Sequence, residues 1–218
     1  LQREAKSFFL ATRLLPRSKR EAAEAIYGLF RAADDIADEP GISDDERRRE
    51  LDAIAQTVEQ IRDRDARSDA PWFPAVYDAF ARYPISIADA LRLIATCRAD
   101  VDGVRCDTLA DLEAYCAGVA GTVGRCTMAI LGADDPDSLR RAEHLGIALQ
   151  LTNILRDVPR DHAIGRDYLP SSVPVDEIVR RARTHYKEAG VLASRLPDLG
   201  SRLAIVAAAK LYERKLPM

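Results

Sequence analysis

Two largely apolar stretches of the chain carry acidic residues at helical spacing. Asp34 and Asp38 lie four positions apart within residues 18–38, and Asp157 and Asp161 repeat that spacing at the end of a second stretch. Residues four apart share one face of a helix. An unpartnered carboxylate on an otherwise apolar helix costs several kcal/mol, so we expect a cation or a water-filled cavity to receive these side chains.

Other polar residues extend both lines. Tyr27 and Arg31 precede Asp34 at spacings of four and three, and Gln150 and Asn153 precede Asp157 at three and four. Their neighbours are mainly Ala, Ile and Leu, which cover the other faces of both predicted helices and indicate burial. Each helix is therefore expected to present one polar stripe to a shared site.

The spacing alone proves little, because the chain has two further aspartate pairs four apart. Asp65 and Asp69 lie in a polar, solvated segment. Asp107 and Asp111 adjoin a predicted helix start, where Thr108 and Asp111 form a capping box. The pairs on the apolar helices differ because burial gives their carboxylates a cost that a ligand must offset.

Facing carboxylates on two helices suit Mg²⁺, a hard ion that takes oxygen ligands and commonly bridges to substrate phosphates. Arg31, Arg156 and Arg166 would then act as forked donors to those phosphates. The pattern thus favours a metal-diphosphate site.

Two alternatives compete with that interpretation. In an internal salt-bridge network, Arg31 pairs with Asp34 or Asp35, and Arg156 pairs with Asp161. A di-iron site is disfavoured, because the three histidines lack the Glu-x-x-His arrangement that such bundles use.

The elements that carry these residues are expected to be helices throughout. No stretch alternates apolar and polar residues for long enough to make a strand, so the sequence predicts an all-α fold. Gly118, Gly121 and Gly124 lie inside a predicted helix with no strand before it, which indicates close helix packing and not a nucleotide-binding loop. The predicted helices cover residues 2–14, 18–38, 44–66, 73–82, 86–103, 108–131, 136–158, 176–195 and 199–214.

Composition sets the wider limits. The 218 residues suffice for one sizeable core, and a single domain over residues 1–218 is expected. With 32 Lys and Arg against 35 Asp and Glu, the net charge of −3 gives no basis for nucleic acid as a partner. Four cysteines without a Cys-x-x-Cys pair indicate reduced, buried thiols of a cytoplasmic protein. The longest clean apolar run, residues 203–209, is far shorter than the roughly 20 residues of a membrane-spanning helix.

Three segments resemble those of the squalene and phytoene synthases, the head-to-head prenyl synthases. Residues 25–40, AIYGLFRAADDIADEP, resemble the first aspartate-rich motif of that family, and residues 149–170, LQLTNILRDVPRDHAIGRDYLP, resemble the second. Between them, residues 115–124, YCAGVAGTVG, resemble the helix that lines the pocket for the substrate tail. The likeness runs in order from Ser7 to about Pro170 and continues more weakly to Tyr212.

The resemblance implies an isoprenoid-synthase bundle of helices around a central cavity that holds two identical prenyl diphosphates. It implies a condensation that depends on Mg²⁺, or Mn²⁺ in its place, and that passes through a cyclopropylcarbinyl diphosphate. Farnesyl diphosphate, leading to presqualene diphosphate or squalene, is favoured over geranylgeranyl diphosphate, leading to phytoene. No nicotinamide motif is visible, so NADPH is not expected. Release of such a product implies peripheral contact with the inner face of a membrane.

The resemblance also implies residue roles. The metal ligands are Asp34, Asp38, Asn153 and Asp157, with Asp161 in support. The substrate contacts are Ser7, Tyr27, Arg31, Tyr115, Gln150, Arg156, Arg166, Tyr168 and Tyr212. At the reacting diphosphate the implied catalytic set is Asp34, Asp38, Asp157, Asp161, Tyr27 and Arg31. The rings of Tyr27, Tyr115 and Tyr168 are candidates to stabilise carbocations, with plain packing as the alternative. Asp100 stays open between a helix-end charge and a site residue.

The second motif departs from the family pattern. Pro159 follows Asp157 closely, and a proline disfavours helical backbone at the residue before it. Asp161 is therefore expected beyond a kink and ranks below Asp157 as a ligand.

The chain also departs from the family in length. Relatives carry a longer connection after Pro170 and a further helix or more after Tyr212, so the domain is expected to lack a loop and a C-terminal segment. Those missing segments favour one alternative function, a non-catalytic helical partner subunit. A terpene cyclase acting on one diphosphate is the other alternative, which both head-to-head motifs disfavour.

Overall fold

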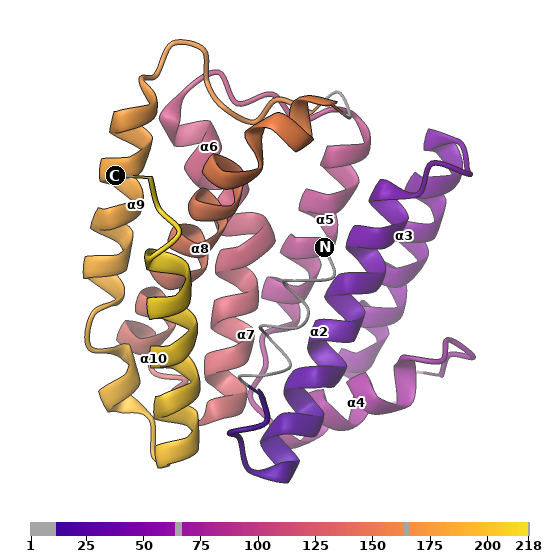
Figure 1. The fold of residues 1–218 in the computed structure, drawn as a ribbon. Coiled ribbons are helices and arrows are strands. Elements are labelled where there is room, and N and C mark those ends of the chain that lie inside the picture. The colour runs from indigo at the N-terminus through magenta and orange to yellow at the C-terminus, as the bar shows by residue number, and fades with distance from the viewer. Residues whose placement is uncertain (1–11, 64–66, 164–165, 218) are drawn as a thin grey trace.

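Residues 12–63, 67–163 and 166–217 are described by a computed structural model, and they form a bundle of helices with no strand among them (Figure 1). The helices are α2 (Arg17–Asp38), α3 (Asp44–Gln60), α4 (Phe73–Arg82), α5 (Ile87–Val101), α6 (Leu109–Cys116), α7 (Thr122–Leu131), α8 (Pro136–Ala163), α9 (Val175–Ala189) and α10 (Leu199–Glu213). Short 3-10 turns lie at Ile61–Asp63 and Leu192–Arg195. The predicted all-α class is confirmed, while the predicted helix over 2–14 falls almost entirely outside the described residues.

The arrangement brings the two polar stripes to one end of the molecule. Helices α2 and α8 both run toward the top of Figure 1, with α7 packed against each of them. Helix α5 packs against α2, α3 and α7, and α9 covers α8 on the opposite side. Asp38 at the end of α2 and Asp157 near the end of α8 therefore lie at the same end of the bundle.

Helix α8 extends beyond the end predicted for it. It continues through Pro159 to Ala163, five residues beyond its predicted end, so Asp161 lies within the helix. A proline removes one backbone donor and crowds the preceding turn. Here Val158, Pro159 and Arg160 lie at the exposed end of the helix, where water can satisfy the carbonyl group that loses its partner.

Helix starts follow from local side-chain chemistry. The hydroxyls of Ser43, Ser86 and Thr108 accept hydrogen bonds from backbone N–H groups three residues on, which have no partner within the helix. At Thr108 the carboxylate of Asp111 also accepts from the Thr108 N–H, which completes the predicted capping box.

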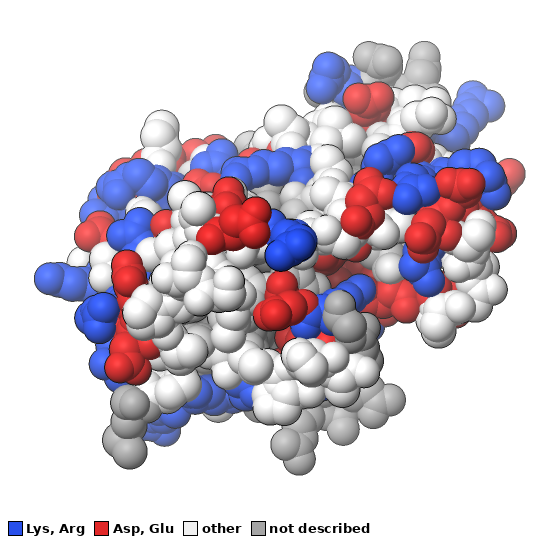
Figure 2. Space-filling view, turned by 90° about the horizontal axis from the view of Figure 1, so that it is seen from above, with Lys and Arg blue, Asp and Glu red and all other residues white. Residues whose placement is uncertain are grey.

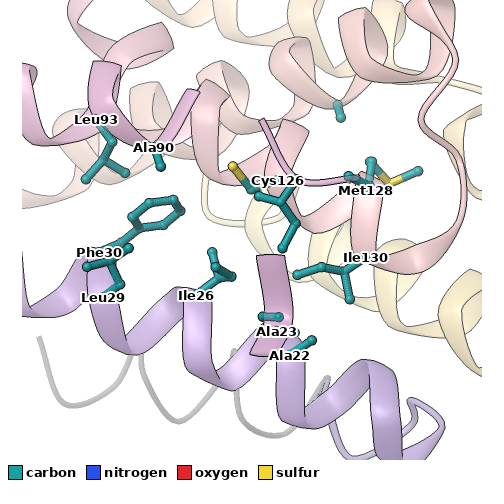
Figure 3. Packing of buried hydrophobic residues seen from close by; sticks show 14 of the residues in the cluster. Ala22, Ala23, Ile26, Leu29, Phe30, Ala90, Leu93, Cys126, Met128 and Ile130 are labelled. Atoms are coloured by element: carbon teal, nitrogen blue, oxygen red, sulfur yellow. The ribbon is translucent and has the colours of Figure 1, made fainter. Parts of the chain in front are cut away.

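The core lies where α2, α5 and α7 meet. Phe30 of α2 lies beside Leu93 of α5, and Ala22 and Ala23 of α2 face Ile130 of α7, as Figure 3 shows. Alanine on α2 lets these helices pack closely. A second buried cluster joins α6, α8 and α9.

The glycines of the third motif serve close packing, as predicted. A Cβ on Gly124 would stand 2.4 Å from the carbonyl oxygen of Ala142, and one on Gly146 would stand 2.2 Å from that of Ala120. At both glycines the backbone of α8 lies directly against the backbone of the 117–131 segment. The segment itself contains a π-helical turn, Ala117–Gly121, which breaks the single helix predicted over 108–131. Such a turn inserts one extra residue, a feature that periodicity over a short window does not show.

The helical stretch Leu109–Leu131 is long and apolar enough to cross a membrane by length and composition. Its most apolar window is 61% buried inside the bundle, as expected for the core helix of a soluble protein. Cys97, Cys106, Cys116 and Cys126 are buried free thiols, in agreement with the prediction. Basic and acidic side chains alternate over the end of the bundle seen in Figure 2 and form no large patch of one sign.

Candidate active site

A polar cavity of about 270 Å³ lies between α2, α5, α6, α8 and the segment that follows α8. The predicted site residues that line it are Tyr27, Arg31, Asp34, Asp38, Tyr115, Gln150, Asn153, Asp157, Asp161, Arg166 and Tyr168. The fold thus brings together side chains separated by up to 141 residues of sequence, counted from Tyr27 to Tyr168.

On the α2 side, arginines hold the carboxylates. Arg31 donates to Asp34 at 3.0 Å and also pairs with Asp35, while Arg166 pairs with Asp38 across the cavity. The protein atoms around Asp34 and the negative charge of Asp38 raise the pKa of Asp34 to about 6. Asp34 is therefore the carboxylate of this stripe whose charged form the surroundings disfavour.

On the α8 side, one polar atom lacks a partner. The amide oxygen Oδ1 of Asn153 is buried and accepts no hydrogen bond from any group in the described part of the chain. Such an atom costs about 1–3 kcal/mol unless a ligand or water satisfies it. Asp157, one turn further along, pairs with its neighbour Arg156, which holds the pKa of Asp157 below its usual range.

Within the described ranges, no three Asp, Glu, His or Cys side chains come close enough to hold a metal ion. Asp38 and Asp157 are each engaged in an ion pair, with Arg166 and Arg156 respectively. The oxygen donors that a hard divalent ion prefers are nonetheless present on both walls, and the unpartnered oxygen of Asn153 is one of them.

The salt-bridge alternative describes part of this arrangement. Arg31 does pair with Asp34 and Asp35, as that interpretation predicted. The side chains in the ion pairs of Arg31, Arg156 and Arg166 keep between about a quarter and three fifths of their surface exposed, so water can reach these pairs. Solvated pairs contribute little stability and can exchange partners when a charged ligand arrives.

The wall opposite the acidic stripes contains a residue that sequence reasoning left open. The hydroxyl of Tyr115 donates to Asp100 at 2.8 Å, and the rings of Tyr115 and Tyr168 stack with centroids 5.0 Å apart. Burial raises the pKa of Asp100, and the hydrogen bond from Tyr115 opposes that rise. The signal for this residue in the sequence is weak, because Asp100 is flanked by Arg98 and Asp102 near the end of the helix predicted over 86–103.

A second cavity, of about 500 Å³ and mainly apolar, adjoins the first. Tyr27, Val123, Gln150 and Asn153 line both cavities, so the polar and the apolar space lie side by side. Of the remaining predicted residues, Tyr212 lines this apolar cavity, and Arg156 reaches the site through its pair with Asp157. Ser7 lies outside the described residues.

Helices that surround a charged cavity joined to an apolar one define the isoprenoid synthase fold. Solved structures agree: a dehydrosqualene synthase in complex with ligand matches with a TM-score of 0.85 and 27% identity, covering 98% of this chain and 81% of its own. A squalene synthase from Alicyclobacillus acidocaldarius also gives 0.85 and 27%, covering 96% and 86%. The family model for squalene/phytoene synthase matches residues 1–173, and the chain belongs to that family.

Curated relatives carry two related names. The phytoene synthase of Mycobacterium tuberculosis is 42% identical over 166 residues, which is 76% of this chain and 53% of the relative. The presqualene diphosphate synthase of Zymomonas mobilis is 36% identical over 180 residues, covering 79% and 61%. The chain thus spans about half to three fifths of the length of these relatives.

Proposed function

We propose that this chain catalyses the head-to-head condensation of two identical prenyl diphosphates through a cyclopropylcarbinyl diphosphate. The observation that carries the proposal is that the acidic and arginine-lined cavity adjoins the apolar one, with Tyr27, Gln150 and Asn153 lining both. A prenyl diphosphate needs a charged cavity for its diphosphate group and an adjoining apolar cavity for its hydrocarbon tail. Relatives named for phytoene and for presqualene diphosphate synthesis support the same reaction type.

The arginines are proposed to receive the diphosphate. Arg31 and Arg166 face the cavity and are paired with carboxylates that a divalent cation can take over. Once released, their guanidinium groups present two parallel donors to phosphate oxygens. They thereby stabilise the negative charge that accumulates on the leaving group as the allylic C1–O bond breaks.

Asp34, Asp38, Asn153 and Asp157 are the proposed ligands of Mg²⁺, or of Mn²⁺ in its place, with Asp161 in support. When bound, the ion neutralises the diphosphate and makes it a better leaving group. The fit rests on the oxygen donors of both helices and on the unpartnered amide oxygen of Asn153. No role is proposed for NADPH.

The apolar cavity is proposed to hold the prenyl tails and to keep water from the carbocation. Its wall is built from small and aliphatic side chains, among them Ala120, Gly124 and Leu145. Farnesyl chains are the preferred substrate in this proposal, with geranylgeranyl chains second. We treat residues 1–218 as one domain of the family.

The reaction is proposed to take place in the cytoplasm, with peripheral contact to the inner face of a membrane for product release. The apolar cavity reaches the exposed residues Leu14 and Leu211, and further exposed leucines, Leu199 and Leu203, lie on α10. An apolar product leaving by this route meets an apolar surface. No nucleic acid enters the proposal.

The test is turnover with each diphosphate separately in the presence of Mg²⁺, with diphosphate release and lipid products both measured. Asp34→Asn is expected to lower turnover by at least about a hundredfold while the melting temperature stays close to wild type, because the change removes one ligand charge and no packing. Asp78→Asn is the matched control: Asp78 is 56% exposed and pairs with an arginine on its own helix, as Asp34 does at 49%, but lies outside both cavities.

The outcomes separate the alternatives. A product built from a single diphosphate molecule indicates a terpene cyclase. Binding of both substrates without diphosphate release indicates a non-catalytic partner subunit. Equal turnover of the Asp34→Asn and Asp78→Asn variants refutes the ligand assignment.

A further inference from the structure

Asp100 lies in the cavity wall between the arginine-lined end and the aromatic side chains. It ends α5, whereas Tyr115 belongs to α6 and Tyr168 to the segment after α8. Three elements far apart in sequence therefore place one carboxylate and two phenol rings in the same cavity. The mechanism outlined above uses neither Asp100 nor the contact it makes.

The contact is specific. Tyr115 is 8% exposed, and its hydroxyl donates to Oδ2 of Asp100 at 2.8 Å. Tyr168, 9% exposed, stacks on Tyr115 with an angle of 21° between the ring planes. A hydroxyl group bonded to a carboxylate and a ring held by its neighbour have little freedom to rotate. The two rings are thus fixed as one unit.

The charges around this unit have a consistent order. Asp100 lies within electrostatic reach of Arg166 and Asp38, the ion pair at the polar end of the cavity. The rings share this cavity with the ion pair, and Tyr168 lies within electrostatic reach of both Arg166 and Asp38. A carbocation formed by loss of diphosphate arises close to these rings, because its leaving group stays with the arginines.

We propose that Asp100 is a positioning residue that fixes Tyr115 and Tyr168, both of which it contacts, so that their rings stabilise the carbocation. The inference rests on the proposed function above. A ring stabilises a cation only when the cation lies over its face within about 6 Å of the centroid, so the orientation of the rings decides the effect. Loss of the hydrogen bond from Tyr115 lets the paired rings turn away from that orientation.

Two simpler roles are possible for Asp100, and each makes a different prediction. If Asp100 only holds α5 to α6, its replacement lowers stability and affects all ligands equally. If Asp100 acts only by its own negative charge, removal of the Tyr115 hydroxyl has no effect on cation binding, because Tyr115→Phe keeps the charge of Asp100. Positioning requires that both replacements weaken cation binding.

The experiment measures the binding of two probes by calorimetry, in the presence of Mg²⁺ and inorganic diphosphate. One probe is a C15 prenyl ammonium ion, which mimics the carbocation, and the other is the uncharged C15 prenyl alcohol. The variants are Asp100→Asn, Tyr115→Phe and the double variant. Asp102→Asn is the matched control, since Asp102 follows two residues later at the end of the same helix, is half exposed and pairs with Arg48 outside the cavity.

The wild type and Asp102→Asn are expected to prefer the ammonium probe. Asp100→Asn removes the charge of the acceptor, and Tyr115→Phe removes the donor, of one charge-assisted hydrogen bond, so each is expected to weaken ammonium binding by about tenfold with alcohol binding unchanged. The double variant is expected to lose less than the sum of the two single variants, because both changes act on the same contact.

An unchanged ammonium preference in Tyr115→Phe overturns the proposal, and so does an equal loss of both probes in Asp100→Asn. If Asp100→Asn does not fold, Tyr115→Phe against Asp102→Asn still decides the question. The test needs no turnover, so absence of any condensation product would refute the proposed function while the role of Asp100 is decided separately.

Discussion

Replacement of Gly146 by alanine tests how the apolar cavity is built. Gly146 lies in α8 one turn before Gln150 and lines the apolar cavity. Its added Cβ would stand 2.2 Å from the carbonyl oxygen of Ala120, 2.6 Å from the carbonyl carbon and 2.8 Å from the Cα of Gly121, whereas ordinary contact begins at 3.4 Å. All three neighbours are backbone atoms of the π-helical turn, so no side chain can move aside.

The helix and the turn must therefore separate by more than an ångström at this point. Forcing extra volume into a packed interior costs about 1–3 kcal/mol, against a gain of roughly 0.5–1 kcal/mol from replacing a glycine within a helix. Gly28→Ala is the matched control. Gly28 lies in the middle of α2, where an added Cβ meets nothing within 4 Å, so only the gain applies.

Thermal unfolding of the two variants gives opposite predictions. At about 2–4 °C per kcal/mol for a chain of this size, Gly146→Ala is expected to lower the melting temperature by several degrees, and Gly28→Ala to raise it slightly. Binding of the C15 prenyl alcohol is expected to weaken in Gly146→Ala alone, because the cavity wall shifts. A Gly146→Ala variant at least as stable as Gly28→Ala would refute the assigned close approach of α8 to the turn.

Three further predictions concern the rest of the chain. Burial and the neighbouring His185 lower the pKa of His144 from 6.5. The folded state therefore binds fewer protons than the unfolded state, and the free energy of unfolding is expected to fall as the pH drops below about 6.5. In urea titrations at about pH 5 to 7.5, His144→Gln should reduce this fall. The four cysteines are buried, and burial raises the pKa of each thiol, so an aromatic disulfide reagent is expected to label none of them until the chain unfolds; fast labelling of the native protein would contradict their placement. Thr108→Ala removes the capping box of α6 and is expected to cost about 1 kcal/mol of unfolding free energy, whereas Thr184→Ala, whose exposed hydroxyl bonds only within its own helix, should cost less.

The positions of the two acidic stripes were predictable because helical spacing on apolar helices is a strong local signal. Asp34, Asp38, Asn153 and Asp157 were assigned to one site from such spacing and from the family resemblance, and the fold places all four around one cavity. The capping box at Thr108 was equally local. Each of these features is decided within a few residues of sequence.

Features that depend on contacts between distant segments were not predictable. Arg166 pairs with Asp38 over 128 positions, and nothing local to either residue specifies that partner. Asp100 gains its role from Tyr115 and from a helix crossing that no spacing encodes. The continuation of α8 through Pro159 was not predictable for a different reason. Residues 158–160 are exposed, so water can bind the backbone carbonyl group that loses its partner at the proline.

The most direct test of the account uses a prenyl diphosphate labelled with ¹³C at C1. Head-to-head condensation puts two labelled carbons into one product. In the cyclopropylcarbinyl diphosphate both labelled carbons are bonded to the same unlabelled carbon, and after rearrangement to the hydrocarbon they are bonded directly to each other. The account predicts one of these two ¹³C patterns, formed only with Mg²⁺ and lost in Asp34→Asn. Products that contain a labelled carbon from one diphosphate molecule only, or two labelled carbons in neither of these arrangements, would contradict it.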